Sequence, residues 1–173
     1  MDETGVLGLL EELSILLEDS KPVFGKNNLR QVDVSAAFEI IDTPSSFGPE
    51  LKEGLGQQCL HIQRVHLLEK ARTAYAEIYI PGKYGANFTK ADVESRTIYQ
   101  LYEKKLHMQL GRGKQTIRAS SQAAKALQIP EGWPVLSIRR RAYNAQGELV
   151  EYMIMTYEYT QYSFDVELNL SSR

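Results

Sequence analysis

The sequence is poor in cysteine and histidine and contains no long apolar run. Cys59 is the single cysteine among 173 residues, which excludes an intramolecular disulfide framework and agrees with a reducing, cytoplasmic location. The three histidines are scattered, so neither a metal site nor a cofactor is predicted. No apolar run approaches the roughly 20 residues that span a bilayer, and no signal-peptide pattern is present. A membrane partner is therefore not expected.

A strong excess of one charge is also missing. The formal net charge is -2, which provides no general attraction to nucleic acid or to anionic lipid. Hydrophobic residues make up 43% of the chain and charged residues 24%, as is typical of a globular protein. The length suits one domain with a sizeable core.

The first 30 residues differ from the remainder in their apolar spacing. Six leucines recur at three- and four-residue intervals between residues 6 and 18, which predicts an amphipathic helix: Leu7, Leu9, Leu10, Leu13, Leu16 and Leu17. We therefore divide the chain into an N-terminal helix and connection, residues 1–30, and a main domain, residues 31–173.

The main domain alternates short helical patterns with two-residue periodicity. Strands are predicted at residues 32–41, 58–69, 73–81, 111–119, 163–168 and in a hairpin at 136–159, and helices at 46–55, 95–107 and 120–127. Short turns between successive strands favour antiparallel pairing. The predicted class is α+β, a mostly antiparallel sheet with flanking helices.

Two of the predicted hairpins share an unusual arrangement of charge. A loop at residues 145–146 would place Arg140 opposite Glu151, and a loop at residues 70–71 would place Arg64 opposite Glu77. Burying charge is costly unless it is paired or meets a ligand. The two pairs are therefore either structural ion pairs or the walls of a shared cleft.

An ordered series of segments resembles a known family. It consists of residues 77–81 (EIYIP), 97–103 (TIYQLYE), 115–119 (QTIRA), 132–140 (GWPVLSIRR) and 147–152 (GELVEY). Together they resemble the UTRA domain, the effector-binding and dimerisation domain of GntR-superfamily transcription regulators of the HutC type, over about residues 45–168. The resemblance implies a fold similar to chorismate lyase.

The resemblance also implies a ligand site on one face of the sheet. Carried over by position, its residues are Arg64, His66, Glu77, Thr97, Glu151 and Tyr157. Arginine and a helix N-terminus suit a carboxylate or phosphate, and glutamates accept hydrogen bonds from hydroxyls or amines. The family more often has a second arginine at position 66, and a histidine there titrates near neutral pH.

Three functions follow from these observations. The leading hypothesis is a homodimeric sensor for a polar small molecule, such as an anionic metabolite or a sugar derivative, in a transcription repressor. DNA would be bound only through an N-terminal winged helix-turn-helix domain absent from these residues. The alternatives are an enzyme like chorismate lyase, for which no additional nucleophile or base is evident, and a dimerisation module without a ligand. The run of residues 139–141, all arginine, is expected to be a solvated edge, because alternate residues of a strand diverge.

Overall fold

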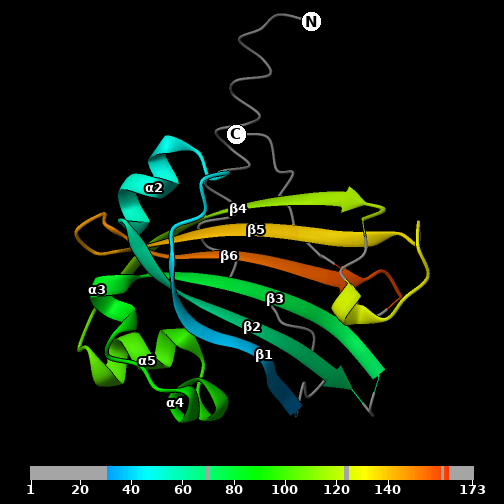
Figure 1. The fold of residues 1–173 in the computed structure, drawn as a ribbon, viewed down its shortest axis with the longest axis horizontal. Helices are drawn as coiled ribbons and strands as arrows, with labels where there is room; N and C mark the ends of the chain where they lie inside the picture. Colours follow the sequence, from blue (N-terminus) through cyan, green and yellow to red (C-terminus); the bar gives the residue numbers. More distant parts are fainter. Residues whose placement is uncertain (1–30, 69–70, 123–124, 161, 164–173) are drawn as a thin grey trace, which may run out of the picture. The chain divides into compact units, whose positions relative to one another are not determined.

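A computed structural model describes residues 31–68, 71–122, 125–160 and 162–163. The predicted helix at residues 6–18 and nearly all of the predicted strand at residues 163–168 lie outside the described residues. Within residues 28–162, which form one compact unit, the fold is a six-stranded sheet with short helices (Figure 1). The predicted α+β class is confirmed.

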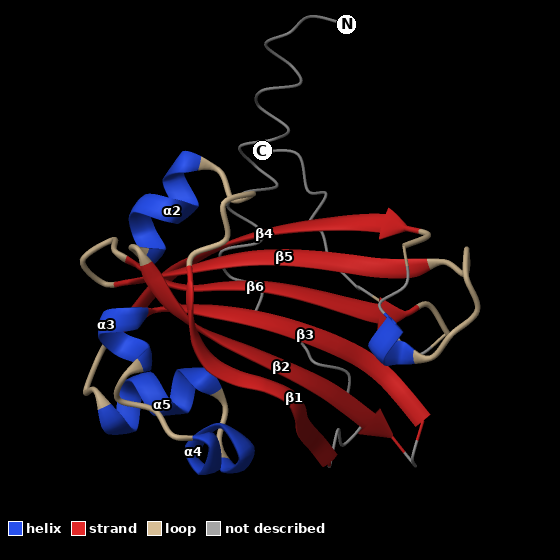
Figure 2. Ribbon diagram, viewed as in Figure 1, coloured by secondary structure: helices blue, strands red, loops and turns tan. Residues whose placement is uncertain are grey.

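The strands are β1 (Gln31–Asp42), β2 (Gln58–Leu68), β3 (Ala71–Pro81), β4 (Leu110–Ser120), β5 (Val135–Asn144) and β6 (Leu149–Glu158). Their order across the sheet is β1-β2-β3-β6-β5-β4, and every neighbouring pair is antiparallel. The central pair, β3 and β6, joins the N-terminal three strands to the C-terminal three (Figure 2).

The helices are short: α2 (Pro49–Leu55), α3 (Gly82–Gly85), α4 (Lys90–Ser95), α5 (Ile98–Lys105) and the 3-10 turn η1 (Lys125–Leu127). Figure 1 shows α3, α4 and α5 gathered at one end of the sheet and η1 at the other. None of the described helices is long and apolar enough to cross a membrane.

The helical segments differ from prediction in three places. Residues 82–94, for which no helix is predicted, contain α3 and α4, and the predicted helix at residues 95–107 begins only at Ile98. Thr97 has an extended backbone and caps α5, accepting a hydrogen bond from the Gln100 N–H while the Gln100 side chain accepts from the Thr97 N–H. Such a capping box starts a new helix, so α4 and α5 are separate. Around the predicted helix at residues 120–127, the described part shows only η1.

The two faces of the sheet bury different apolar clusters. The larger cluster lies between one face and the helices α4 and α5, and includes Ile62, Ile78, Ile138, Leu101 and Tyr102. The smaller lies on the opposite face under α2, and its members are Leu51, Leu55, Cys59, Tyr79, Tyr143, Leu149 and Tyr152. Because successive side chains of a strand alternate between faces, every strand residue belongs to one of these two environments.

The pairing of β2 with β3 corrects one predicted register. Arg64 pairs with Ala76, and Glu77 pairs with Gln63. The hairpin closes one position earlier than predicted, pairing Leu68 with Ala71, and an irregularity follows at His66. A one-residue change of register moves a side chain to the other face. The prediction that Glu77 lies opposite Arg64 is therefore wrong.

The pairing of β5 with β6 corrects the second. Glu151 pairs with Ala142, and Arg140 pairs with Met153. The connection is longer than the predicted two residues, because the Asn144 side chain accepts hydrogen bonds from the backbone N–H groups of Gln146 and Glu148. A further register shift lies between Ala142 and Tyr143. Two such shifts leave Arg140 and Glu151 on the same face, so the predicted pair is diagonal rather than directly opposed.

Candidate functional site

Glu151 is the buried centre of a polar cluster on the sheet face that α4 and α5 cover. Glu151 is only 1% exposed. Its Oε1 accepts hydrogen bonds from Arg140 Nη2 at 3.2 Å and from the Tyr99 hydroxyl at 3.3 Å. The Arg140 guanidinium lies 5.0 Å from the centre of the Tyr99 ring. Burial lowers the pKa of Arg140, but Glu151, Tyr99 and Tyr157 together more than offset this effect and the net pKa is raised. Arg140 therefore remains a cation.

Arg64 extends the cluster from β2. It is buried, and its Nη2 donates a hydrogen bond of 2.7 Å to the Val93 carbonyl of α4. Burial lowers the pKa of Arg64, and Glu151 partly offsets that effect. Because Glu151 acts on both arginines, the cluster joins the two hairpins across the centre of the sheet.

His66 and Tyr157 lie on the same face, at the β3–β6 junction. Both pair with Ala74, His66 from β2 and Tyr157 from β6. Burial, reinforced by Arg64, lowers the pKa of His66 to about 4, so the imidazole is neutral at pH 7. The expectation of titration near neutrality is therefore wrong for this state of the protein. Tyr157 is buried and stacks on Tyr162, with ring centres 3.9 Å apart.

Three nitrogen atoms in this cluster are buried without a hydrogen-bond partner among the described residues. They are Arg64 Nε, His66 Nδ1 and Arg140 Nε. A buried donor without a partner costs roughly 1–3 kcal/mol. The two arginine Nε atoms on this sheet face are donors, so they are suited to a ligand that brings its own acceptors.

Thr97 and Glu77 do not join the cluster. Thr97 is exposed, and its hydroxyl is used to cap α5. Glu77 lies on the opposite face, where His61 Nε2 is 3.8 Å from its Oε1. The proximity of His61 lowers the pKa of Glu77 in spite of partial burial. The structure thus brings together Arg64, His66, Glu151 and Tyr157, and leaves the other two predicted residues apart.

Two members of the cluster were not among the predicted site residues. Arg140 was predicted only as the partner of Glu151; it does hold Glu151, but its Nε also has no hydrogen-bond partner among the described residues. Tyr99 was missed altogether. Tyr99 lies in α5 between the buried residues Ile98 and Leu101, and this position could have indicated that it is close to the core. The pattern does not show which strand its hydroxyl contacts.

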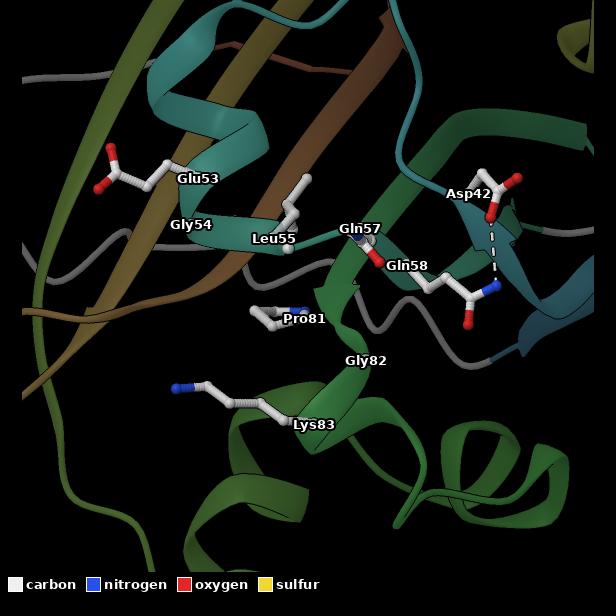
Figure 3. A pocket seen from close by; sticks show the side chains of 10 residues that line it. Asp42, Glu53, Gly54, Leu55, Gln57, Gln58, Pro81, Gly82 and Lys83 are labelled. Atoms are coloured by element: carbon white, nitrogen blue, oxygen red, sulfur yellow. Dashed lines mark hydrogen bonds between the residues drawn. The ribbon is translucent and has the colours of Figure 1, made fainter.

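A separate hollow of 610 Å³ lies where α2 leads into β2 and β3 leads into α3 (Figure 3). Its lining includes three glycines and the hydrogen-bonded side chains of Gln58 and Asp42. Lys83, its one lining cation, already pairs with Glu148 at 3.3 Å. None of the predicted site residues lines it. Over the described ranges, no group of three or more metal-ligating side chains is present.

Comparison with known proteins agrees with this arrangement of strands. Residues 37–163 match the model of the UTRA domain. The chain belongs to this family. A curated relative, the HTH-type transcriptional repressor NagR of Bacillus subtilis (strain 168), is 26% identical over 158 residues. That alignment covers 90% of this UTRA chain and 63% of NagR, so the chain spans less than two thirds of this relative.

Solved structures share the fold. A GntR-family transcriptional regulator from Enterococcus faecalis V583 superposes with a TM-score of 0.67 at 22% identity, covering 76% of this chain and 96% of that one. The C-terminal domain of the histidine utilization repressor from Pseudomonas syringae pv. tomato str. DC3000 superposes with a TM-score of 0.68 at 19% identity. The match covers 80% of this chain and 98% of that one. The named relatives are transcription regulators, and the UTRA chain has the fold of their C-terminal domains.

Proposed function

We propose that this UTRA chain is the sensing domain of a GntR-type transcription repressor and binds a small effector at the Arg64–Glu151 cluster. The observation that carries the proposal is a set of buried nitrogens on the sheet face of Glu151, from Arg64, His66 and Arg140, that have no hydrogen-bond partner among the described residues. A protein that keeps such groups without a ligand loses stability. An effector that supplies acceptors recovers that loss, and the recovered energy favours its binding.

The charges at the cluster restrict the chemistry of the effector. Two guanidinium groups and one carboxylate leave one net positive charge, since His66 is neutral at pH 7. That balance suits a monoanion or a zwitterion whose carboxylate or phosphate meets the arginines. Glu151 would accept hydrogen bonds from a hydroxyl or amino group of the same molecule, and Tyr157 would contact its apolar part. The N-terminus of α5 at Thr97 remains a proposed contact for the anionic group.

The signal would pass from the effector to DNA through a change in population. A homodimer in the bacterial cytoplasm would hold two DNA-reading winged helix-turn-helix domains at a spacing set by its UTRA domains. An effector that binds one dimer geometry more tightly shifts the population toward that geometry, and the spacing of recognition helices determines operator affinity. The similarity to NagR, a transcriptional repressor, supports repression as the direction of regulation.

Thermal shift of this chain with a panel of amino acids, dicarboxylates and sugar phosphates tests the proposal. A ligand that binds only the folded state raises the melting temperature. At a hundred times its Kd, it increases the free energy of unfolding by about 2.7 kcal/mol. The hit must lose its effect in Arg64→Lys and in Glu151→Gln. Binding that survives both substitutions would contradict this site, and a silent panel with a stable dimer would favour the dimerisation module without a ligand.

A further inference from the structure

A hollow of 540 Å³ lies on the sheet face opposite the Arg64–Glu151 cluster. Its wall is α2, which stands beside the ends of β4 and β5 (Figure 1). The floor is apolar and includes Phe47, Tyr152 and Ile154. The rim on the side of β4 and β5 is cationic, with Lys114, Arg118, Arg139 and Arg141. None of these residues belongs to the ligand site that the family resemblance implies or to the proposed effector cluster.

Strand pairing gathers these cations from two separate stretches of sequence. Lys114 pairs with Arg141, and Thr116 pairs with Arg139. Alternate residues share a face, so Arg118 joins them from β4 while Arg140 points to the other face and meets Glu151. The arginine run is not a continuous basic face, as expected, but its two outer members combine with β4 into one basic rim.

Most of the positive charge on the rim is uncompensated. Arg141 donates a hydrogen bond of 2.7 Å to Glu50 of α2. Within the part of the chain that the structure describes, the side chains of Lys114, Arg118 and Arg139 form no hydrogen bond or ion pair. Cations confined to one hollow repel one another, and an anion between them would relieve that repulsion.

The apolar floor is already assembled. The Phe47 ring packs edge-on against Tyr79 at 5.0 Å and against Tyr152 at 5.3 Å between ring centres. The volume of the hollow falls within the roughly 300–1,000 Å³ of small-molecule sites. A nucleic-acid backbone would use the cations but would leave an apolar floor uncovered. From this combination we infer that the hollow binds a small organic anion whose carboxylate or phosphate meets Lys114, Arg118 and Arg139 and whose apolar body covers Phe47 and Tyr152.

Phenyl phosphate is a suitable probe, because it joins one anionic group to one aromatic ring. Isothermal titration calorimetry of the whole chain at low ionic strength should show binding about tenfold tighter than that of inorganic phosphate, since burying the ring adds to the charge interaction. Phenol at the same concentrations should show no saturable binding. Equal affinity for phenyl phosphate and inorganic phosphate would overturn the role of the apolar floor.

Variants separate this hollow from the effector cluster. The double substitution Arg118→Gln/Arg139→Gln should weaken phenyl phosphate binding at least about tenfold, because two charged hydrogen bonds are lost. Both side chains are exposed, so circular dichroism should be unchanged. Lys104→Gln, which removes one charge at an exposed position of α5, is the control and should leave binding intact, as should Arg64→Lys.

Three results would overturn the inference. They are no binding of phenyl phosphate at millimolar concentration, binding that the double substitution leaves unchanged, and binding that Arg64→Lys abolishes. Binding of a short DNA duplex alone, lost in the double variant, would overturn it as well and would assign the rim to nucleic acid. Binding that Arg64→Lys abolishes would assign phenyl phosphate to the effector cluster, whereas the other results leave the proposed effector site untouched.

Discussion

Arg140 reaches diagonally along the β5–β6 hairpin to Glu151, although its direct partner across the strands is Met153. The guanidinium nitrogen lies 3.2 Å from the carboxylate oxygen, and the Glu151 side chain is 2% exposed against 17% for Arg140. The pair is thus almost wholly removed from water while one further nitrogen of Arg140 remains unpartnered. Such a pair costs stability when either member is missing, and it leaves an arginine prepared for a ligand.

Removal of one member of this pair should destabilise the folded protein strongly, and removal of both should cost less than the two single changes added together. Arg140→Met leaves a buried carboxylate without its cation and should lower the free energy of unfolding by about 3–5 kcal/mol. Arg140→Met/Glu151→Met should cost clearly less than the sum of the two single changes. Urea unfolding of the four proteins in a double-mutant cycle measures the coupling.

The Lys90–Glu94 pair of α4 provides the control for that cycle. Its atoms are 3.9 Å apart and both side chains are largely exposed, so its coupling should be only about 0.3–0.5 kcal/mol. A coupling between Arg140 and Glu151 no larger than this would show that the buried pair is not what holds the hairpin charges in place.

His66 should make the protein less stable as the pH falls from 6.5 to 4. Its folded pKa is lowered to about 4 from the ordinary histidine value of 6.5, so in this window the unfolded chain binds a proton that the folded chain does not. One such group removes about 1.4 kcal/mol of stability per pH unit. His66→Gln should flatten that part of the pH dependence, measured as the free energy of unfolding at several pH values.

Above pH 6.5 the histidine is neutral in both states, so the wild type and His66→Gln should show parallel pH dependences there. Parallel curves below pH 6.5 would mean that His66 is protonated in the folded protein. The cluster would then carry two net positive charges in acid, and the proposed effector class would change accordingly.

Glu151→Gln should weaken the binding of the compound that most raises the melting temperature of the wild type, whereas Glu77→Gln should not. The two positions lie on different faces of the sheet, and only Glu151 contacts Arg140. Glu151→Gln should weaken binding about tenfold or more, because a charge-assisted contact is lost. Glu77→Gln should leave the Kd unchanged within a factor of two. An equal loss in both would show that the effector is not confined to the face of Glu151.

Gly147→Ala should destabilise the β5–β6 connection. Gly147 has φ +83°, a conformation that costs other residues about 1–2 kcal/mol. Gly48→Ala is the matched control, since Gly48 has φ -64° and a Cβ there meets nothing within 4 Å. Thermal unfolding of both variants should show a lower melting temperature for Gly147→Ala alone. Equal melting temperatures would mean that the connection relaxes into another turn.

The sequence predicted the elements of the sheet better than their registers. Alternating apolar residues place Leu60 and Ile62 on a buried face, and this pattern survives any shift of pairing. The partner of Arg64 depends instead on where one turn closes and on one irregular position at His66. Neither feature is encoded by periodicity, because both come from local hydrogen bonds such as that from the Thr73 hydroxyl to the His66 carbonyl.

The candidate site shows the same division. Arg64, His66, Glu151 and Tyr157 were predicted as site residues, and the structure places them on one face. Tyr99 could not be predicted as a partner of Glu151, since the contact requires a helix and a strand that are 52 positions apart to meet. A contact of that kind is a property of the packed domain.

The antiparallel pairing of β3 with β6 has a consequence for how the chain folds. It joins residues as far apart in sequence as Ala74 and Tyr157, whereas each half of the sheet is built from neighbouring hairpins. Closing so long a loop carries a large entropic cost, and such contacts form slowly. The two halves should therefore assemble first and dock last. Since Arg64 and Glu151 sit on opposite sides of that junction, a molecule held by both would act on the same step that completes the fold.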